Sequence, residues 1–521
     1  MSFDRFLRRK SLDQLVGEAT EPQHQLRRAL GPLQLTMLGV GAIVGAGIFS
    51  TVGTAAAGGG EHIGAGPALV ISFLIVAVAC GFAALCYSEF AAMVPISGSA
   101  YTYAYATLGE LAAWLIGWDL ILEYAISNAA VAVSWSAYFQ TLLAAFHLHV
   151  PSWLGTDFRS AIQAAAQLAN AQAAHADLSK LDPSVLHDAQ AMREAPRILG
   201  LPFIFNLPAF GIVVLVTWVV LVGIRETAHF NTSLVIGKLV IILFFLVIGA
   251  AHIQPENWVP FAPNGLKGIS AAAAIIFFAY IGFDAVSTAA EETRNPQRDM
   301  PIGIIASLII CTILYVAVAA VLTGMAKWNT LDNAEPLASV FSSLGMGWTA
   351  TIIAFGAVIA TTSALIPYQA GQPRIFFSMA RDGLLPAWAS KVHPRFRTPH
   401  VTTIITGVVV AACSSVANIN ELVELTNIGT LFAFVLVAAG VIILRRTDPE
   451  RARPFRTPWV PLVPLGAIAT CAYLMFELPP VTWIRFFLWM AAGLVIYFLY
   501  GVRNSRLASG RRPEQPGPSP K

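Results

Sequence analysis

Apolar stretches long enough to cross a lipid bilayer recur along almost the whole chain. Hydrocarbon offers no water to backbone N–H and C=O groups, so stretches of this length indicate membrane-spanning helices. The expected helices cover residues 33–57, 68–94, 108–146, 208–224, 229–252, 269–290, 302–324, 349–380, 401–417, 421–443, 459–477 and 483–500. The sequence therefore predicts an all-α integral membrane protein with about 12 transmembrane helices.

The composition agrees and argues against other classes of protein. Of the 521 residues, 56% are hydrophobic and 12% are charged, whereas about 25% of a soluble protein is charged. The formal net charge of +3 gives no reason to expect a nucleic acid partner. The five cysteines fall inside expected spans and lack metal-ligand spacing, so we expect no metal, no cofactor and no disulfide framework.

The distribution of lysine and arginine predicts the orientation. With the N-terminus in the cytoplasm, most basic residues of the loops fall on the cytoplasmic side, as the positive-inside rule requires. We therefore expect cytoplasmic tails at 1–32 and 501–521, the second of them Pro-rich and disordered. The expected location is the cell membrane, which in a bacterium is the inner membrane.

One segment outside the membrane is long. Residues 147–206 are rich in Ala, Gln and Leu, which favours two short amphipathic helices on the external side. Two interpretations remain open: a cap over the external face, or an insertion without a role in transport.

Glycine interrupts two of the expected helices at corresponding places. The stretch "GAIVGAGIF" puts Gly41, Gly45 and Gly47 in the middle of the first span, and "FFAYIGFDAVSTAAEE" puts Gly282 and Asp284 in the sixth. Glycine weakens a helix by about 0.5 to 1 kcal/mol relative to alanine, so such clusters require a reason in packing or function. Paired interruptions five spans apart are typical of secondary transporters built from two inverted repeats.

This pattern divides the chain into two repeats. The first covers 33–252 and includes the loop 147–206, the second covers 269–443, and the last two helices at 459–500 lie outside both. An unwound helix exposes N–H groups at one new end and carbonyls at the other, which suit a carboxylate and an ammonium respectively. The sequence therefore predicts a site for a small zwitterion, such as an α-amino acid, at the two breaks.

Four long motifs, in order along the chain, resemble a known family. They are "GAIVGAGIF", "YSEFAAMVPISGSAYTYAYATLGELAAWLIGWDLILEY", "FFAYIGFDAVSTAAEETRNPQRDMPIGI" and "GQPRIFFSMARDGLLP". The chain is similar over residues 30–500 to the amino acid–polyamine–organocation (APC) superfamily, and within it to bacterial members of the cationic amino acid transporter family. This resemblance implies the five-plus-five inverted-repeat, leucine transporter-type fold, with helices 1 and 6 broken, and uptake of L-amino acids.

The resemblance also implies roles for residues of the first break. Ala46 and Gly47 would bind the substrate carboxylate through their backbone N–H groups. Gly45 would let the substrate approach, and the carbonyl of Ile43 would accept from the substrate ammonium.

On helix 6 the resemblance implies that the carbonyls of Phe278, Ala279 and Ile281 line the site and that the Phe278 ring gates it. Tyr368, three residues before "GQPR", stands where an aliphatic or Met pocket wall is expected. Its bulk and hydroxyl bear on the preference for substrate side chains.

Lys238, near the centre of the fifth span, is the most informative single residue. An ammonium in hydrocarbon costs several kcal/mol, so an intramembrane lysine is a functional candidate. A lysine on helix 5 resembles the proton-coupled branch of this fold, in which the ammonium replaces a sodium ion. We expect Lys238 to carry the coupling proton and to support the helix 1 break. The alternative is a permanently charged Lys238 that only holds helix 1, with transport by exchange or facilitated diffusion.

Three acidic residues inside or near the spans, Glu123, Asp284 and Glu89, have two interpretations each. Asp119 and Glu123 share one face of helix 3, and Glu123 either attracts cationic side chains in the pocket or bonds to a neighbouring helix. Asp284 is either part of the site or a cap for unwound backbone. Glu89 either closes an inner gate with Arg374 or Arg381 or is a solvated helix end.

A secondary transporter explains these features best. The chain has no HExxH or GxSxG motif, so an enzyme is not expected, and a channel would need a repeated filter or a ring of charges. The prediction is proton-coupled uptake of L-amino acids by alternating access, with the amino acid, the proton and the bilayer as partners. The alternatives are an exchanger of cationic amino acids or polyamines, and a membrane amino acid receptor without flux. The sequence does not decide whether an accessory subunit is needed.

Overall fold

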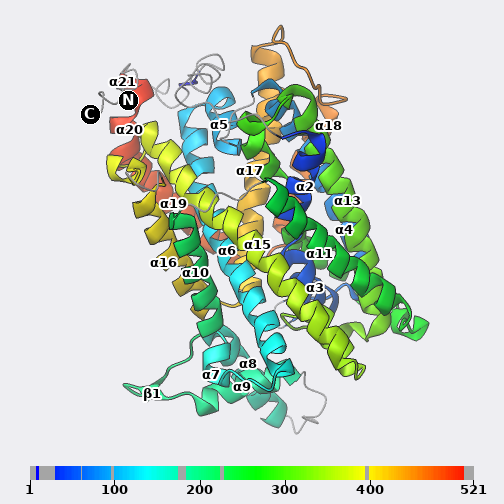
Figure 1. Ribbon diagram of the computed structural model, residues 1–521. Coiled ribbons are helices and arrows are strands. Elements are labelled where there is room, and N and C mark those ends of the chain that lie inside the picture. The colour runs from blue at the N-terminus through cyan, green and yellow to red at the C-terminus, as the bar shows by residue number, and fades with distance from the viewer. Residues whose placement is uncertain are drawn as a thin grey trace.

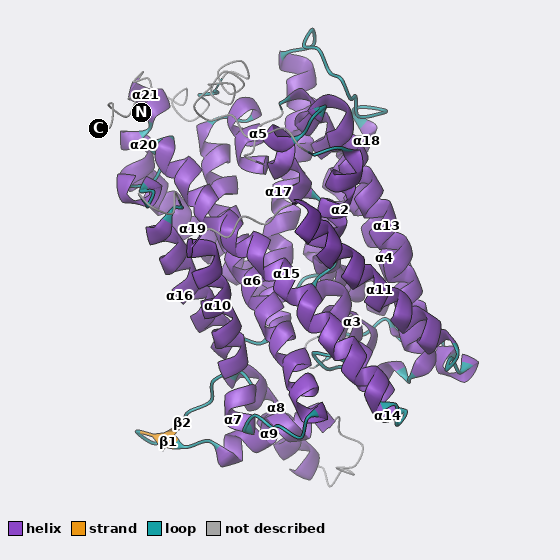
Figure 2. Ribbon diagram, viewed as in Figure 1, coloured by secondary structure: helices purple, strands orange, loops and turns teal. Residues whose placement is uncertain are grey.

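The computed structural model describes residues 8–10, 30–59, 62–94, 99–173, 183–222, 228–393 and 398–509. Long helices run alongside one another and form a single bundle, and a small group of helices with one hairpin lies against part of one end of it (Figure 1). Figure 2 shows that helices make up nearly all of the described chain and that the hairpin projects from that end.

The predicted all-α membrane architecture is confirmed. In the described part of the chain, eight helices are long and apolar enough to cross a membrane, and a ninth follows if Pro32–Ile43 and Gly47–Ala57, bent by 44°, are one span. Three shorter apolar helices, α10 (Leu207–Val222), α16 (His400–Val416) and α18 (Leu462–Phe476), occupy positions where spans were expected. Each expected span therefore corresponds to one apolar helix or broken helix.

The remaining long helices follow the predicted ranges closely. Before residue 252 they are α2 (Pro32–Ile43), α3 (Val52–Ala57), α4 (Leu69–Met93), α6 (Glu110–Ala145) and α11 (Ala228–Ala250). After it come α12 (Gly265–Ile276), α13 (Pro296–Met325), α15 (Gly347–Arg381), α17 (Ile419–Thr447) and α19 (Pro480–Ile496).

Two helices between spans were not predicted. They are α5 (Ser99–Thr107) and α14 (Pro336–Ser343), of nine and eight residues. Neither carries an apolar stretch of spanning length, so hydropathy alone does not reveal them. Both bury apolar side chains against the bundle, Tyr103 and Tyr105 from α5 and Leu337 and Phe341 from α14.

The described part of the long loop forms a compact unit, which we call the cap. It contains the two amphipathic helices that were expected, α8 (Phe158–Ala173) and α9 (Pro183–Glu194), together with the short helix α7 (Ser152–Gly155). A two-stranded antiparallel hairpin, β1 (Arg197–Ile198) and β2 (Leu201–Pro202), pairs Arg197 with Pro202. Residues 174–182 of the loop lie outside the described residues.

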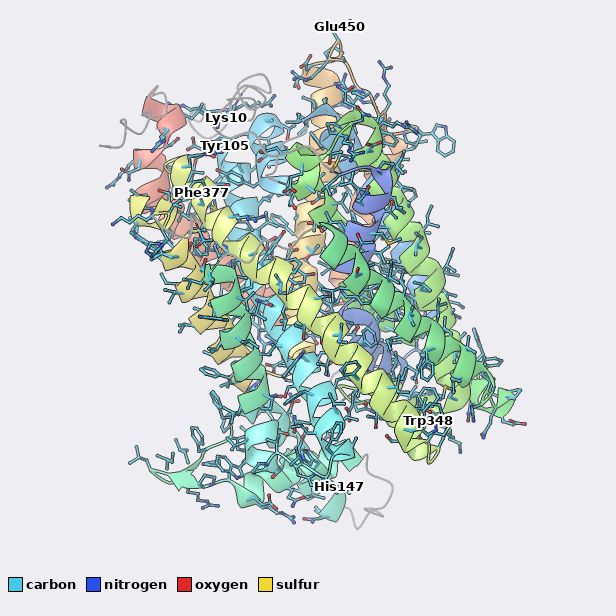
Figure 3. All side chains as sticks on the ribbon, viewed as in Figure 1. Lys10, Tyr105, His147, Trp348, Phe377 and Glu450 are labelled. Carbon is cyan, nitrogen blue, oxygen red and sulfur yellow. The ribbon has the colours of Figure 1, made fainter. Side chains whose placement is uncertain are left out.

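The first and last described residues lie at the end of the bundle opposite the cap. Lys10 and Tyr105 are near this end, and His147 and Trp348 are near the other (Figure 3). The backbone N–H of Lys10 donates to the Tyr105 carbonyl, and that of Arg506 donates to the Asp382 carbonyl.

Part of the tail that was expected to be disordered is helical. The short helices α20 (Val502–Asn504) and α21 (Arg506–Ser509) pack here because the Ser505 hydroxyl donates to the buried Glu110 carboxylate at 2.5 Å. Residues 510–521, and most of the expected tail at 1–32, lie outside the described residues.

Candidate functional site

The first span, which contains α2 and α3 and which we call helix 1, is broken at its cluster of glycines. Helix α2 ends at Ile43, Val44 is extended with φ −76° and ψ 95°, and the chain resumes at Gly47 as a π-helical turn that leads into α3. The first hydrogen bond of the second half runs from the Phe49 N–H to the Gly45 carbonyl at 3.4 Å. The N–H groups of Ala46 and Gly47 precede this bond, where a helix N-terminus has free donors.

The sixth span is broken at the matching place. Helix α12 ends at Ile276, a 3-10 turn covers Phe277–Tyr280, and a second 3-10 segment covers Asp284–Glu292. Between them Ile281 is extended and Gly282 has φ +121°, which side chains rarely allow. A glycine is therefore required at 282 by backbone geometry.

The two breaks touch through their backbones. A Cβ atom on Gly47 would lie 2.3 Å from the Cα of Ala279, and one on Gly282 would lie 2.8 Å from the carbonyl carbon of Ala42. These distances are far below an ordinary carbon contact of about 3.5 Å. Gly47 and Gly282 thus let the break of the first span and the break of the sixth span pack against each other without intervening side chains.

Lys238 holds the end of the first half of helix 1. Its Nζ atom donates to the carbonyl of Gly41 at 2.8 Å and to that of Val44 at 3.1 Å, and the residue is 1% exposed. The absence of a side chain at Gly41 lets α11, which carries Lys238, pack closely against helix 1. A Cβ atom at residue 41 would lie 2.6 Å from a methyl group of Val235 on α11. Lys238 therefore satisfies two carbonyls that the break removes from helical hydrogen bonds.

A second side chain at this break was missed by the sequence analysis. The hydroxyl of Tyr315, on α13, donates to the Ile43 carbonyl at 3.0 Å. Its ring is buried between Tyr280 and Phe73, with centroid distances of 5.5 and 5.6 Å. A carbonyl oxygen has two lone pairs, so Ile43 retains capacity for the substrate ammonium that the resemblance implies.

The other expected pocket residues gather around the same two breaks. Phe278 is buried, and its carbonyl accepts from the Ile281 N–H at 3.3 Å. Tyr368, on α15, meets the Tyr124 ring edge-on at 5.7 Å, and both tyrosines lie close enough to Asp284 to interact with it electrostatically. A Cβ atom on Gly45 would lie 3.3 Å from the Cβ of Ala364 on the same α15.

The two carboxylates on α6, Asp119 and Glu123, are both buried. Asp119 is 0% exposed and neither of its oxygens has a hydrogen-bond partner among the described residues; the same holds for Oε2 of Glu123. Glu123, one turn along α6 from Asp119, is 2% exposed. Asp284, at the start of the second 3-10 segment of the sixth span, is 4% exposed.

The pairing suggested for Glu89 is wrong. Its carboxylate accepts two hydrogen bonds from Arg445, at 2.9 and 2.8 Å, and one from the Thr457 N–H at 2.8 Å, and Arg453 lies 3.3 Å away. Arg374 and Arg381 have no part in this cluster. It joins α4 to α17 and to the chain that follows α17, at the end opposite the cap.

The breaks are covered on the cap side. The Ser50 hydroxyl lies 2.5 Å from the Ser134 hydroxyl on α6 and 2.5 Å from the carbonyl of Ala334, just before α14. A Cβ atom on Gly53 would lie 2.2 Å from the Leu331 carbonyl oxygen. The segment 331–336 therefore packs directly on the second half of helix 1.

A bundle of apolar helices in which two broken helices meet through their backbones is typical of membrane transporters. The sequence matches the amino acid permease family over residues 30–499. The chain belongs to this family and is a bacterial-type member of the APC superfamily.

Characterised relatives match over nearly the whole chain. The branched-chain amino acid permease BcaP of Bacillus subtilis is 44% identical over 502 residues, which cover 96% of this chain and 98% of the relative. The methylthioribose transporter of the same organism is 43% identical over 500 residues, with the same coverage. The vacuolar cationic amino acid transporter 4 of Arabidopsis thaliana is 35% identical over 450 residues, 85% of this chain and 68% of the relative. The chain is thus an amino acid permease of the membrane.

Proposed function

We propose that this permease takes up neutral L-amino acids together with protons by alternating access, and that Lys238 carries the coupling proton. The observation that carries the proposal is the pair of hydrogen bonds from the Lys238 ammonium to the Gly41 and Val44 carbonyls across the break of helix 1.

Loss of the proton would change this contact in a defined way. A charged ammonium presents three N–H donors, whereas a neutral amine keeps two and turns a lone pair toward its surroundings. Charge-assisted hydrogen bonds are also about twice as strong as neutral ones. Deprotonation would therefore weaken the hold of α11 on the first half of helix 1, and with it the substrate site that this half contributes.

The breaks supply groups for both ends of a zwitterion. The Ala46 and Gly47 N–H groups face a substrate carboxylate, and the Ile43, Phe278, Ala279 and Ile281 carbonyls provide acceptors for the ammonium. The two relatives above 40% identity are named for a branched-chain amino acid and for methylthioribose, neither of which carries a cationic side chain. This favours neutral substrates, with Tyr368 and Tyr124 limiting the space for the side chain.

The orientation of the protein in the membrane sets the direction of the proposed transport cycle. We place the cap outside and both chain ends in the cytoplasm, in accordance with the positive-inside rule. Substrate and proton bind from outside, the two repeats rock about the breaks, and release of the Lys238 proton to the cytoplasm loosens helix 1 and frees the substrate.

A second candidate function rests on Glu123. Its Oε2 atom is buried without a hydrogen-bond partner among the described residues, and a buried carboxylate in that condition is costly. A cationic substrate side chain would satisfy it, which would make the protein an exchanger of cationic amino acids or polyamines.

One uptake experiment separates the two. Proteoliposomes receive labelled alanine, leucine, threonine, arginine, glutamate or putrescine, each with and without an inward proton gradient. The proposal expects neutral amino acids to enter faster with the gradient. Arginine or putrescine entry that requires substrate inside, with no effect of the gradient, would overturn it in favour of exchange, and binding without any flux would indicate a receptor.

A further inference from the structure

The substrate site must become open to the outside, and the cap side of the bundle carries one contact suited to control this step. The residues of the helix 1 break are buried, with Ile43 at 2% and Ala46 at 1% exposure, so some of the contacts over the site have to separate. The inference below rests on the proposed alternating-access function.

The second half of helix 1 forms one body with the start of α12. After α3 the chain turns back on itself, with the Ala65 N–H donating to the Ala55 carbonyl at 3.0 Å. The Asn264 side chain, just before α12, donates to the Gly64 carbonyl at 2.9 Å. Hydrogen bonds to the Ala55 and Gly64 carbonyls therefore join helix 1 beyond its break, the segment 62–65 and the start of α12.

The start of α17 is held by the cap and by α19. The Asn418 side chain donates to the Ser160 hydroxyl of α8 at 2.7 Å, and Glu421 pairs with Arg159 of α8 at 2.5 Å and with Arg485 of α19 at 3.4 Å. The cap, α17 and α19 are thus connected through the first turn of α17.

A buried chain of side chains links the segment 62–65 to α17 and α19 at this surface. His62 Nε2 donates to Glu424 Oε1 at 2.5 Å, and the other Glu424 oxygen accepts from the Thr482 hydroxyl of α19 at 2.6 Å. The His62 and Glu424 side chains are 9% and 5% exposed. Nε2 can donate to the carboxylate whether the imidazole is neutral or charged, so the link does not depend on the protonation of His62. Farther along α17, Asn427 also donates to the Ala274 and Ile275 carbonyls of α12, at 2.7 and 3.1 Å.

We infer that His62, Glu424 and Thr482 form a clasp that holds the second half of helix 1 against α17 and keeps the site closed on the cap side. Opening to the outside breaks the His62–Glu424 bond, while Glu424 stays on Thr482. The cap remains with α17 during this step, because Arg159 and Ser160 tie it there.

The test reads exposure of a buried position beneath helix 1. Ser134 is 0% exposed and its hydroxyl meets Ser50 in the second half of helix 1, so Ser134→Cys becomes reactive when that half moves away. The reporter is labelled from outside by a membrane-impermeant maleimide in proteoliposomes, and the rate for the parent without the reporter is subtracted. His62→Ala in this background should label about 10-fold faster, because a charge-assisted hydrogen bond no longer holds the closed state.

Two further variants make the result specific. Thr482→Val leaves the His62 bond in place and should raise the rate by a smaller factor. Ser152→Ala is the matched control, because it removes a hydrogen bond of 2.8 Å to Glu194 that lies within the cap, and it should leave the rate unchanged. If the reporter variant folds poorly, the same shift is measured as tighter apparent binding of external leucine by His62→Ala.

Equal labelling rates with and without His62, or equal leucine affinities, would overturn the clasp. The labelling does not involve a proton gradient. Absence of gradient-stimulated uptake by the unmodified protein would therefore overturn the proposed function alone, whereas unchanged labelling with intact uptake would overturn the clasp alone.

Discussion

Replacing Gly47 by alanine tests whether the two breaks have to be in backbone contact. The added methyl group would lie 2.3 Å from the Cα and 2.9 Å from the N of Ala279, atoms that cannot rotate away. Carbon atoms in contact are about 3.5 Å apart, so the breaks would have to separate by about 1 Å. Overpacking of this kind costs about 1–3 kcal/mol.

At about 1.4 kcal/mol for each factor of ten, this cost corresponds to a loss of roughly 5- to 150-fold in kcat/KM for leucine uptake. The substitution keeps the Gly47 N–H, so the loss would come from the spacing of the breaks. The assay is initial uptake by proteoliposomes, with Gly237→Ala as the control, because Gly237 lies beside Lys238 and a Cβ atom there meets nothing within 4 Å. Wild-type uptake by Gly47→Ala would refute the reasoning.

Three further predictions concern different parts of the molecule. Tyr315→Phe removes one neutral hydrogen bond to the Ile43 carbonyl and should raise the KM for leucine by about 2- to 10-fold, measured by uptake, while the dependence on the proton gradient stays the same. Glu89→Ala leaves Arg445 and Arg453 without their buried carboxylate and should destabilise the fold by about 3–5 kcal/mol; an unchanged melting temperature of the purified protein would contradict this. Burial raises the pKa of Asp157, in the cap, to about 7. The Asp157 carboxyl therefore stays protonated to higher pH in the folded cap than in the unfolded chain. Because its deprotonation is disfavoured in the folded cap, the free energy of unfolding of the cap should fall by at most about 4 kcal/mol as pH rises from about 4 to 7. Proteolysis of the cap should be faster at pH 8 than at pH 5, and Asp157→Asn should remove that difference.

The membrane helices could be predicted from the sequence because hydrocarbon forces one solution on the backbone. A stretch such as 302–324 has no alternative to a helix when it is apolar throughout, and α13 covers it. Helices α5 and α14, of nine and eight residues, are too short to span hydrocarbon, so their formation depends on the surface against which they pack. The cap lies between these cases: its amphipathic helices were predicted, whereas its attachment to α17 depends on tertiary contacts.

The breaks of the first and sixth spans were predicted because glycine is costly in a membrane helix and interrupts these two spans at matching places. Lys238 was equally visible, since a lone ammonium in an apolar stretch needs acceptors. Tyr315 was not, because a tyrosine within an apolar span looks like any packing aromatic until its hydroxyl is placed on Ile43. The partner of Glu89 was misassigned because several arginines lie near the same membrane surface, and only the path of the chain after α17 brings Arg445 and Arg453 to it.

The most direct test of the account is accumulation of labelled leucine by proteoliposomes that contain Lys238→Met, driven by an inward proton gradient. Methionine keeps an unbranched side chain of similar length but has no proton to carry, and Lys267→Met, at an exposed position of α12, is the matched control. We predict that the gradient drives accumulation in the unmodified protein and in Lys267→Met, and that Lys238→Met equilibrates leucine at most. Accumulation against a concentration gradient by Lys238→Met, driven by protons as in the unmodified protein, would contradict the account.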